Sequence, residues 1–159
     1  MKIGICLPTE TEAMGGNTAN GTEVLRLARL AEDAGFDSAW VVDHFCYSAA
    51  AEMEALGATA PPDLVGKIYG AWECLTMCAA LARETRRMEI GTLVINTGYR
   101  NPALLARMSE TIDELSAGRF ILGVGAGDFF TEHDTFGYPW ERRVSRFEEA
   151  LQIIRPMLA

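Results

Sequence analysis

Histidine is the side chain that most readily exchanges a proton near neutral pH, and this chain has two, His44 and His133. His44 follows Asp43 directly after the apolar segment 38–42, which is predicted to be a strand. Alternation along that strand places Val42 and His44 on one face and Asp43 on the other. A histidine at a strand end is suited to act as a general base, a proton donor or a hydrogen-bond donor to a bound ring, and it is equally consistent with a structural role.

Two further segments place polar residues or glycines after an apolar strand. Residues 93–98 (LVINTG) bring the amide of Asn96 to a strand exit, where ordinary turn chemistry is the alternative interpretation. Residues 123–128 (GVGAGD) allow close approach of backbone to a ligand, but their G-x-G-x-G spacing differs from the dinucleotide fingerprint. In parallel α/β proteins ligands bind at the carboxyl ends of strands, so all three strand exits are candidate site segments.

Other chemically capable residues are assigned structural roles. Glu132, His133 and Asp134 lack a partner cluster of metal ligands and are interpreted as a solvated loop. The cysteines form no C-x-x-C pair and the two histidines are far apart, so we expect no metal site. Cys74 and Cys78 lie four residues apart in an apolar helical run and are expected to be buried, reduced thiols.

Short apolar runs alternate four times with longer amphipathic runs. Strands are predicted at residues 2–7, 38–42, 87–94 and 119–124, and helices at about 22–34, 72–85, 102–118 and from 141 onward. A loop containing Gly and Asn follows the first strand. The long stretch 43–68 is expected to be functional, to be disordered or to hide a short helix.

The expected helix ends follow from capping rules. Thr22 is the predicted N-cap of the first helix, and Asn101 followed by Pro102 is that of the third. The third helix is expected to turn Leu104, Leu105, Met108, Ile112 and Leu115 inward. Pro156 predicts a last helix that frays at the chain end.

Strands separated by helices must run parallel, joined by right-handed crossovers. Strand segments such as 120–122 are apolar throughout, as in parallel sheets covered on both faces. We therefore predict an α/β fold with four βα units in one domain, residues 1–159, without an internal linker.

Composition excludes several classes of function. The formal net charge of −8 argues against binding to nucleic acid or to an anionic membrane. No apolar run approaches the roughly 18 residues of a membrane span, and the opening apolar segment 3–7 is too short for a signal-peptide core. We therefore expect a cytoplasmic protein.

The sequence resembles the N-terminal half of the luciferase-like monooxygenase superfamily, whose members are TIM barrels that use FMN or the deazaflavin coenzyme F420. The matching motifs occur in the family's order: residues 31–40 (AEDAGFDSAW), 43–44 (DH), 91–92 (GT), 101–106 (NPALLA), 113–119 (DELSAGR), 122–127 (LGVGAG), 136–137 (FG) and 146–151 (RFEEAL).

The resemblance implies roles for individual residues. His44 matches the histidine at the reactive ring of the cofactor, and Asp128 stands where some deazaflavin-dependent dehydrogenases carry an acidic proton donor. Leu93 and Val94 fall where several members have a non-proline cis peptide that supports the ring. Residues matching cofactor- and substrate-facing positions are Asn96, Gly125, Ala126 and Gly127.

The Asp-His pair looks more like the F420-dependent branch, which implies a dehydrogenase or reductase acting by hydride transfer on a small organic substrate. An FMN-dependent monooxygenase is the alternative, and a non-catalytic half-barrel used for assembly or cofactor binding is a third. Only four of the eight βα units are present, so we expect a half barrel that is catalytically incomplete alone.

An open half barrel exposes apolar surface. Its inner face is expected to present residues such as Ile5, Val42, Val94 or Leu122 to water, and the helix at 72–82 to be apolar nearly all round. Exposed apolar patches of this size are rare on soluble monomers. We therefore expect a homodimer or a second half-barrel chain. Pairing through the helices is what the resemblance implies, but we favour pairing that covers the open inner face.

Overall fold

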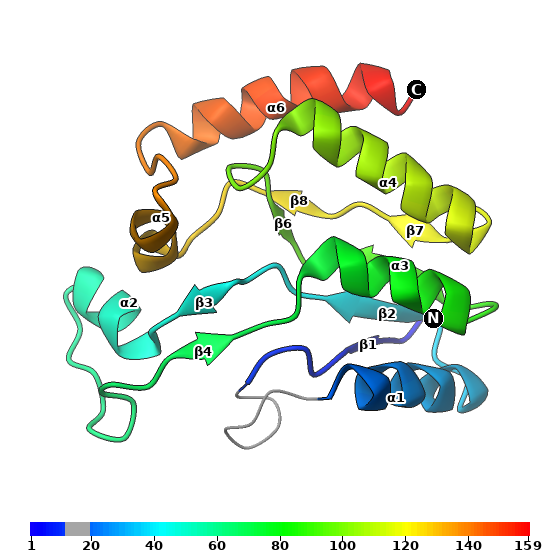
Figure 1. The fold of residues 1–159 in the computed structure, drawn as a ribbon, viewed down its shortest axis with the longest axis horizontal. Coiled ribbons are helices and arrows are strands. Elements are labelled where there is room, and N and C mark those ends of the chain that lie inside the picture. The colour runs from blue at the N-terminus through cyan, green and yellow to red at the C-terminus, as the bar shows by residue number, and fades with distance from the viewer. Residues whose placement is uncertain (12–19) are drawn as a thin grey trace.

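Four short parallel strands form the central sheet of this protein, whose computed structural model describes residues 1–11 and 20–159 (Figure 1). The strands lie side by side in sequence order: β1 (Gly4–Cys6), β2 (Ser38–Val41), β5 (Glu89–Thr92) and β7 (Phe120–Ile121). Each is followed by a long helix, so the predicted α/β fold with four parallel βα units is confirmed. The predicted loop after the first strand lies largely outside the described residues.

Alternation along the strands divides the sheet into two faces. One row across the sheet consists of Ile5, Ala39, Ile90 and Phe120, which pack against the helices. The next row consists of Cys6, Trp40, Gly91 and Ile121, which point to the opposite, inner face. The expectation that Ile5 and Leu122 face inward is wrong, because both pack against the buried core.

The four long helices are α1 (Gly21–Asp33), α3 (Cys74–Glu84), α4 (Pro102–Ser116) and α6 (Arg143–Met157). In α1 the buried residues Val24, Ala28 and Ala31 recur at helical spacing. Its N-cap is Asn20, whose side chain accepts a hydrogen bond from the backbone N–H of Thr22, so the prediction of Thr22 as the cap is wrong. Asn101 caps α4 as predicted, accepting from Ala103 N and Leu104 N.

Helix α3 lies between α1 and α4, and it supplies much of the core. Cys74 and Cys78 are buried and free, as expected. The prediction that α4 turns Leu104 and Leu115 inward is wrong, since they are 55% and 39% exposed.

Helix α6 continues through Pro156 rather than fraying before it. The last turn is held by the burial of Ile154, which is 3% exposed, and by the hydrogen bond from Leu158 N to Ile154 O at 3.2 Å. Packing on α4 therefore outweighs the backbone bond that proline cannot make.

Smaller elements gather at the carboxyl end of the sheet, on the left in Figure 1. They are β3 (Cys46–Tyr47), α2 (Ala49–Ala55), β4 (Tyr69–Gly70), β6 (Ile95–Asn96), β8 (Val124–Gly125) and α5 (Phe130–Phe136). Helix α2 lies within the long stretch 43–68, so this stretch hides a short helix, which was one of the alternatives predicted for it. Within the described part of the chain, no helix has the length and apolar character needed to cross a membrane.

Candidate functional site

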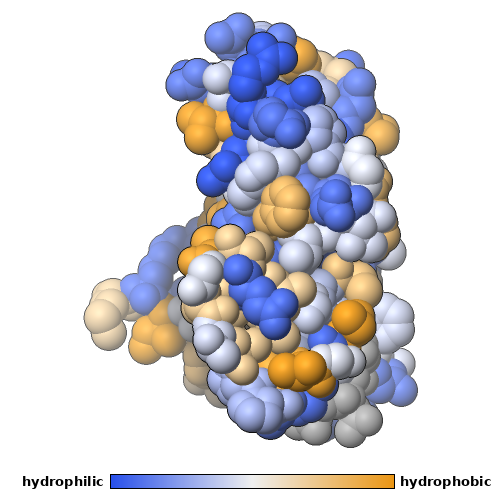
Figure 2. Space-filling model, turned by 90° about the vertical axis from the view of Figure 1, so that its left-hand side faces the viewer, coloured by the Kyte–Doolittle hydropathy of each residue, from blue (hydrophilic) through white to orange (hydrophobic). Residues whose placement is uncertain are grey.

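A cavity of about 370 Å³ opens at the carboxyl end of the sheet. It is lined by Asp43, His44, Leu93, Val94, Asn96, Tyr99, Gly125, Ala126, Gly127 and Asp128. Every site residue predicted from the sequence is in this set, although the set reaches along the sequence from His44 to Asp128. Figure 2 looks onto this end of the molecule, where apolar side chains lie among polar ones and the outline is hollowed along one side.

The apolar wall of the cavity comes from the junction between β5 and β6. The peptide bond between Leu93 and Val94 is cis, as the resemblance implied. Their side chains are 52% and 43% exposed, which is high for aliphatic residues between two strands. Hydrogen bonds on both sides fix this junction, from Leu93 N to Val41 O at 2.8 Å and from Ile95 N to Gly123 O at 2.9 Å.

His44 is held at the cavity by a carboxylate from α5. Its Nδ1 lies 3.0 Å from Oε2 of Glu132, whose side chain is fully buried. Burial lowers the pKa of His44, but the hydrogen bond and negative charge of Glu132 outweigh it, so the pKa is raised from its usual 6.5. With Nδ1 engaged, Nε2 is the ring nitrogen left for the cavity that His44 lines.

The prediction of a solvated loop at 132–134 is wrong. The segment belongs to α5, and Glu132 and His133 are 0% and 1% exposed. The helix is docked by Glu52 of α2, which accepts hydrogen bonds from Phe130 N at 3.1 Å and Thr131 N at 2.7 Å. The aromatic residues around the pair, at positions 129, 130 and 136, are the sequence signal from which a packed segment could have been predicted.

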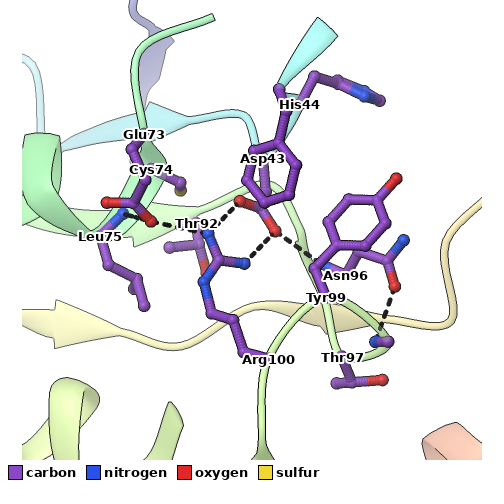
Figure 3. Close-up of polar contacts among 12 residues, drawn as sticks. Asp43, His44, Glu73, Cys74, Leu75, Thr92, Asn96, Thr97, Tyr99 and Arg100 are labelled. Atoms are coloured by element: carbon purple, nitrogen blue, oxygen red, sulfur yellow. Dashed lines mark hydrogen bonds and ion pairs between the residues drawn. The ribbon is translucent and has the colours of Figure 1, made fainter. Parts of the chain in front are cut away.

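Asp43 points away from His44, into a buried ion pair (Figure 3). Arg100 donates two hydrogen bonds to its carboxylate, each 2.7 Å long, and a third of the same length to Glu73. The backbone N–H of Asn96 donates to the same carboxylate at 2.9 Å. Asp43 therefore ties β2 to β6 and to the start of α4, and no local pattern in the sequence marks Arg100 as its partner.

Asn96 is engaged with neighbouring groups rather than free. Its Nδ2 lies 2.8 Å from Nε2 of His133, and its Oδ1 accepts from Gly98 N at 2.9 Å. A Cβ at Gly127 would lie 2.1 Å from Nδ2 of Asn96, and Gly127 has φ +79. This glycine is therefore needed where the loop presses on Asn96.

Two more carboxylates contribute to the charge around His44. Glu10, after β1, and the exposed Asp128, at the β8–α5 loop, both act on the imidazole electrostatically and raise its pKa further. The rings of Tyr47 and Phe129 pack on it, with centroids 5.1 and 4.5 Å away. The surrounding carboxylates thus favour a protonated His44 at the cavity, which suits this histidine to general acid–base chemistry. Sequence reasoning did not single out Glu10.

The four parallel βα units form half of a barrel, and they bring a histidine and an apolar wall together at the carboxyl ends of the strands. This is the end at which α/β barrel proteins bind their ligands. The sequence profile of the family described as Luciferase-like monooxygenase matches residues 1–159, and the chain belongs to this family.

Two curated relatives and one solved structure give the scale of the similarity. The chain is 35% identical over 129 residues to 5,10-methylenetetrahydromethanopterin reductase from Archaeoglobus fulgidus, which covers 81% of the chain and 31% of the relative. It is 34% identical over 139 residues to F420-dependent glucose-6-phosphate dehydrogenase from Amycolatopsis mediterranei, which covers 85% and 37%. A structure of an F420-dependent secondary alcohol dehydrogenase in complex with an F420-acetone adduct superposes with a TM-score of 0.71, at 25% identity over 97% of the chain and 41% of the neighbour. The chain thus spans about a third of the curated relatives it matches.

Proposed function

We propose that this chain is the oxidoreductase module of a luciferase-like enzyme that transfers hydride between coenzyme F420 and a small organic substrate. The observation that carries the proposal is that His44, held by Glu132 through Nδ1, lines a cavity with an apolar wall. The F420-dependent dehydrogenase among its relatives supports this cofactor for this chain.

The lining residues fit a flat, apolar ring with one polar edge. Leu93 and Val94 offer half-exposed aliphatic side chains on one wall. The segment from Gly125 to Gly127 lies directly against this wall, since a Cβ at Gly125 would lie 2.8 Å from Cγ2 of Val94. In this proposal Leu93, Val94, Gly125, Ala126 and Gly127 hold the ring, and Asn96 is a lining residue fixed by its bonds to His133 and Gly98.

A bound deazaflavin supplies hydride-transfer chemistry. The chain's own residues manage the proton: His44 holds or releases it at Nε2, and Asp128 is the second candidate group for exchange with the substrate. Aspartate reaches one methylene less far than glutamate, which makes His44 the principal group in this proposal. Removal of such a group typically lowers turnover by about 10²- to 10⁴-fold.

Two other functions compete with this one. The family's description as monooxygenases favours FMN in place of F420. The edge strands β1 and β7, each paired with a single strand among the described residues, favour the third function, a non-catalytic half barrel used for assembly or cofactor binding.

Fluorescence titration of the purified chain with F420 and, separately, with FMN distinguishes the three functions. Preferential saturation by F420, weakened by a Val94→Asp substitution in the wall, is the expected result. Preferential saturation by FMN replaces the proposal with the monooxygenase. No binding of either cofactor at protein concentrations that give a folded chain supports the non-catalytic module.

We also propose that the open inner face is covered by a second half barrel, most simply by a second copy of this chain. The edge strands β1 and β7 each pair with only one strand among the described residues. Ile121, which shares the inner row with Cys6, Trp40 and Gly91, leaves apolar surface on that face and is 37% exposed. Helix pairing through α3 is less favoured, because six of its eleven residues are buried within the chain.

Sedimentation at low micromolar concentration tests this assembly. A homodimer is expected, and Ile121→Asp should shift it toward monomer because a charge would be placed in the covered face. A folded 17.4 kDa species that stays monomeric overturns the proposal.

A further inference from the structure

We propose that Glu132 is the positioning residue of His44: its carboxylate holds the imidazole through Nδ1–H and thereby presents Nε2 to the cavity as the nitrogen that exchanges the proton. The catalytic consequence rests on the proposed function, whereas the hydrogen-bond arrangement is testable without any turnover. Glu132 does not line the cavity and acts only through the histidine.

The carboxylate of Glu132 accepts hydrogen bonds at both oxygens. Its Oε1 accepts from the backbone N–H groups of Phe45 and Cys46, the latter at 3.0 Å. Its Oε2 accepts from the hydroxyl of Tyr99 at 2.8 Å and lies 3.0 Å from Nδ1 of His44.

These partners determine which ring nitrogen carries the proton. A backbone N–H can only donate, so Oε1 of Glu132 must be an acceptor. An ionised carboxylate accepts at both oxygens, and a buried one is stable only when it is well supplied with donors. Nδ1 of His44 therefore faces an acceptor and must carry hydrogen, which leaves the lone pair of the neutral ring on Nε2.

Electrostatics acts in the same direction. The donors to Glu132 lower the pKa of its carboxyl group, although burial opposes the shift, and this keeps the group ionised. The hydroxyl of Tyr99, which burial and the carboxylate both stabilise in its protonated form, has a raised pKa and stays a donor. Among the residues that the structure describes, the other charged groups that act on His44 are Glu10 and Asp128, and both favour the imidazolium.

The position of Glu132 depends on contacts far from the cavity. Helix α5 has only seven residues, and its first N–H groups are bound by the buried carboxylate of Glu52 on α2. His133, one residue further on, is fixed by Asn96. The two anchors hold the helix so that Glu132 reaches the imidazole, which is what a positioning residue requires.

The substitution Glu132→Gln makes a specific prediction because it nearly preserves shape. The amide oxygen can replace Oε1 and keep the backbone N–H groups of Phe45 and Cys46. The NH₂ group then replaces Oε2 and becomes a donor toward Nδ1 of His44. The neutral imidazole should switch to the Nε2–H tautomer, and its pKa should fall because a negative charge has been removed.

Nitrogen-15 NMR of the full chain measures this directly, because only two histidines contribute. In the wild-type chain at high pH, His44 is expected as the Nδ1–H tautomer. In Glu132→Gln it is expected as Nε2–H with a lower pKa. The tautomer of His133, whose Nε2 accepts from Asn96, serves as the internal control that α5 remains docked. The pKa of His133 cannot serve as this control, because the negative charge of Glu132 acts on it as well. Tyr99→Phe is the matched variant: it removes one donor from Oε2 but keeps the carboxylate, so Nδ1–H should remain and the pKa should not fall.

Three results would overturn the inference. The first is an Nε2–H tautomer of His44 in the wild-type chain, which needs no variant. The second is Glu132→Gln in which the tautomer and the pKa of His44 are both unchanged while His133 keeps its own tautomer. The third is a fall in the His44 pKa in Tyr99→Phe as large as that in Glu132→Gln, which would indicate general loosening. If the tautomer switches while the chain binds neither F420 nor FMN, the proposed function fails and the positioning role of Glu132 stands.

Discussion

Replacing Arg100 with methionine should destabilise the protein severely, because it leaves a buried carboxylate without its counter-ion. The side chain of Asp43 is fully buried and that of Arg100 is 9% exposed. The substitution removes two charge-assisted hydrogen bonds and leaves Asp43 with a single donor, the backbone N–H of Asn96. Each lost bond is worth about 1.5–3 kcal/mol.

The expected loss is therefore about 3–5 kcal/mol in the free energy of unfolding, the range typical of breaking a buried ion pair from one side. The accompanying loss of the bond to Glu73 adds little, since that side chain is 39% exposed. Because whole domains are stable by only about 5–15 kcal/mol, the variant should unfold at much lower urea concentration or fail to fold.

Urea unfolding followed by circular dichroism measures the effect, with two matched variants. Arg107→Met breaks the exposed pair with Glu110, whose side chains are 69% and 38% exposed, and should lose less than about 1 kcal/mol. Asp43→Asn combined with Arg100→Met removes both charges and should recover roughly 2 kcal/mol relative to Arg100→Met alone. A loss below about 1 kcal/mol for Arg100→Met, or no recovery in the double variant, would refute the reasoning.

Three further outcomes are expected. His44→Ala should lower turnover by about 100-fold or more while affecting cofactor binding less, as measured at saturating cofactor, and an unchanged rate would remove His44 from the mechanism. Gly127→Ala should lower the free energy of unfolding in urea by about 1–3 kcal/mol more than Gly137→Ala does. Both glycines have positive φ, but only a Cβ at Gly127 would lie against Asn96. Equal losses of unfolding free energy in the two variants would contradict this clash. The stability advantage of the wild-type chain over His44→Gln should be largest between about pH 4.5 and 6.5. Because the pKa of His44 is raised, the stabilisation from its charged form is complete below pH 6.5 and is lost as the pH rises through the raised value. Because the pKa of Glu132 is lowered, the stabilisation from its carboxylate is complete above pH 4.5 and is lost as the pH falls through the lowered value. Urea midpoints at pH 5.5 and pH 9 test this, and a larger advantage at pH 9 would show that the sign is wrong.

Local sequence patterns were sufficient for the order of the elements. Apolar runs alternating with amphipathic ones predicted the four strands and four long helices in sequence order. The Asn101–Pro102 cap was predictable because a cap is satisfied within one helical turn. The strand exits were predictable as site segments because parallel strands place their carboxyl ends together, so His44, Asn96 and Gly127 meet at one cavity.

What tertiary structure decided was the set of partners across long sequence distances. Glu132 contacts His44 from 88 residues away, Arg100 binds Asp43 from 57 residues away, and Glu52 docks α5 across nearly 80 residues. Polar side chains carry no periodic signal that names a partner, so a buried acid and a solvated one look alike in sequence. The choice between them is made by packing, because a charged group is buried only where the fold supplies enough donors to replace water.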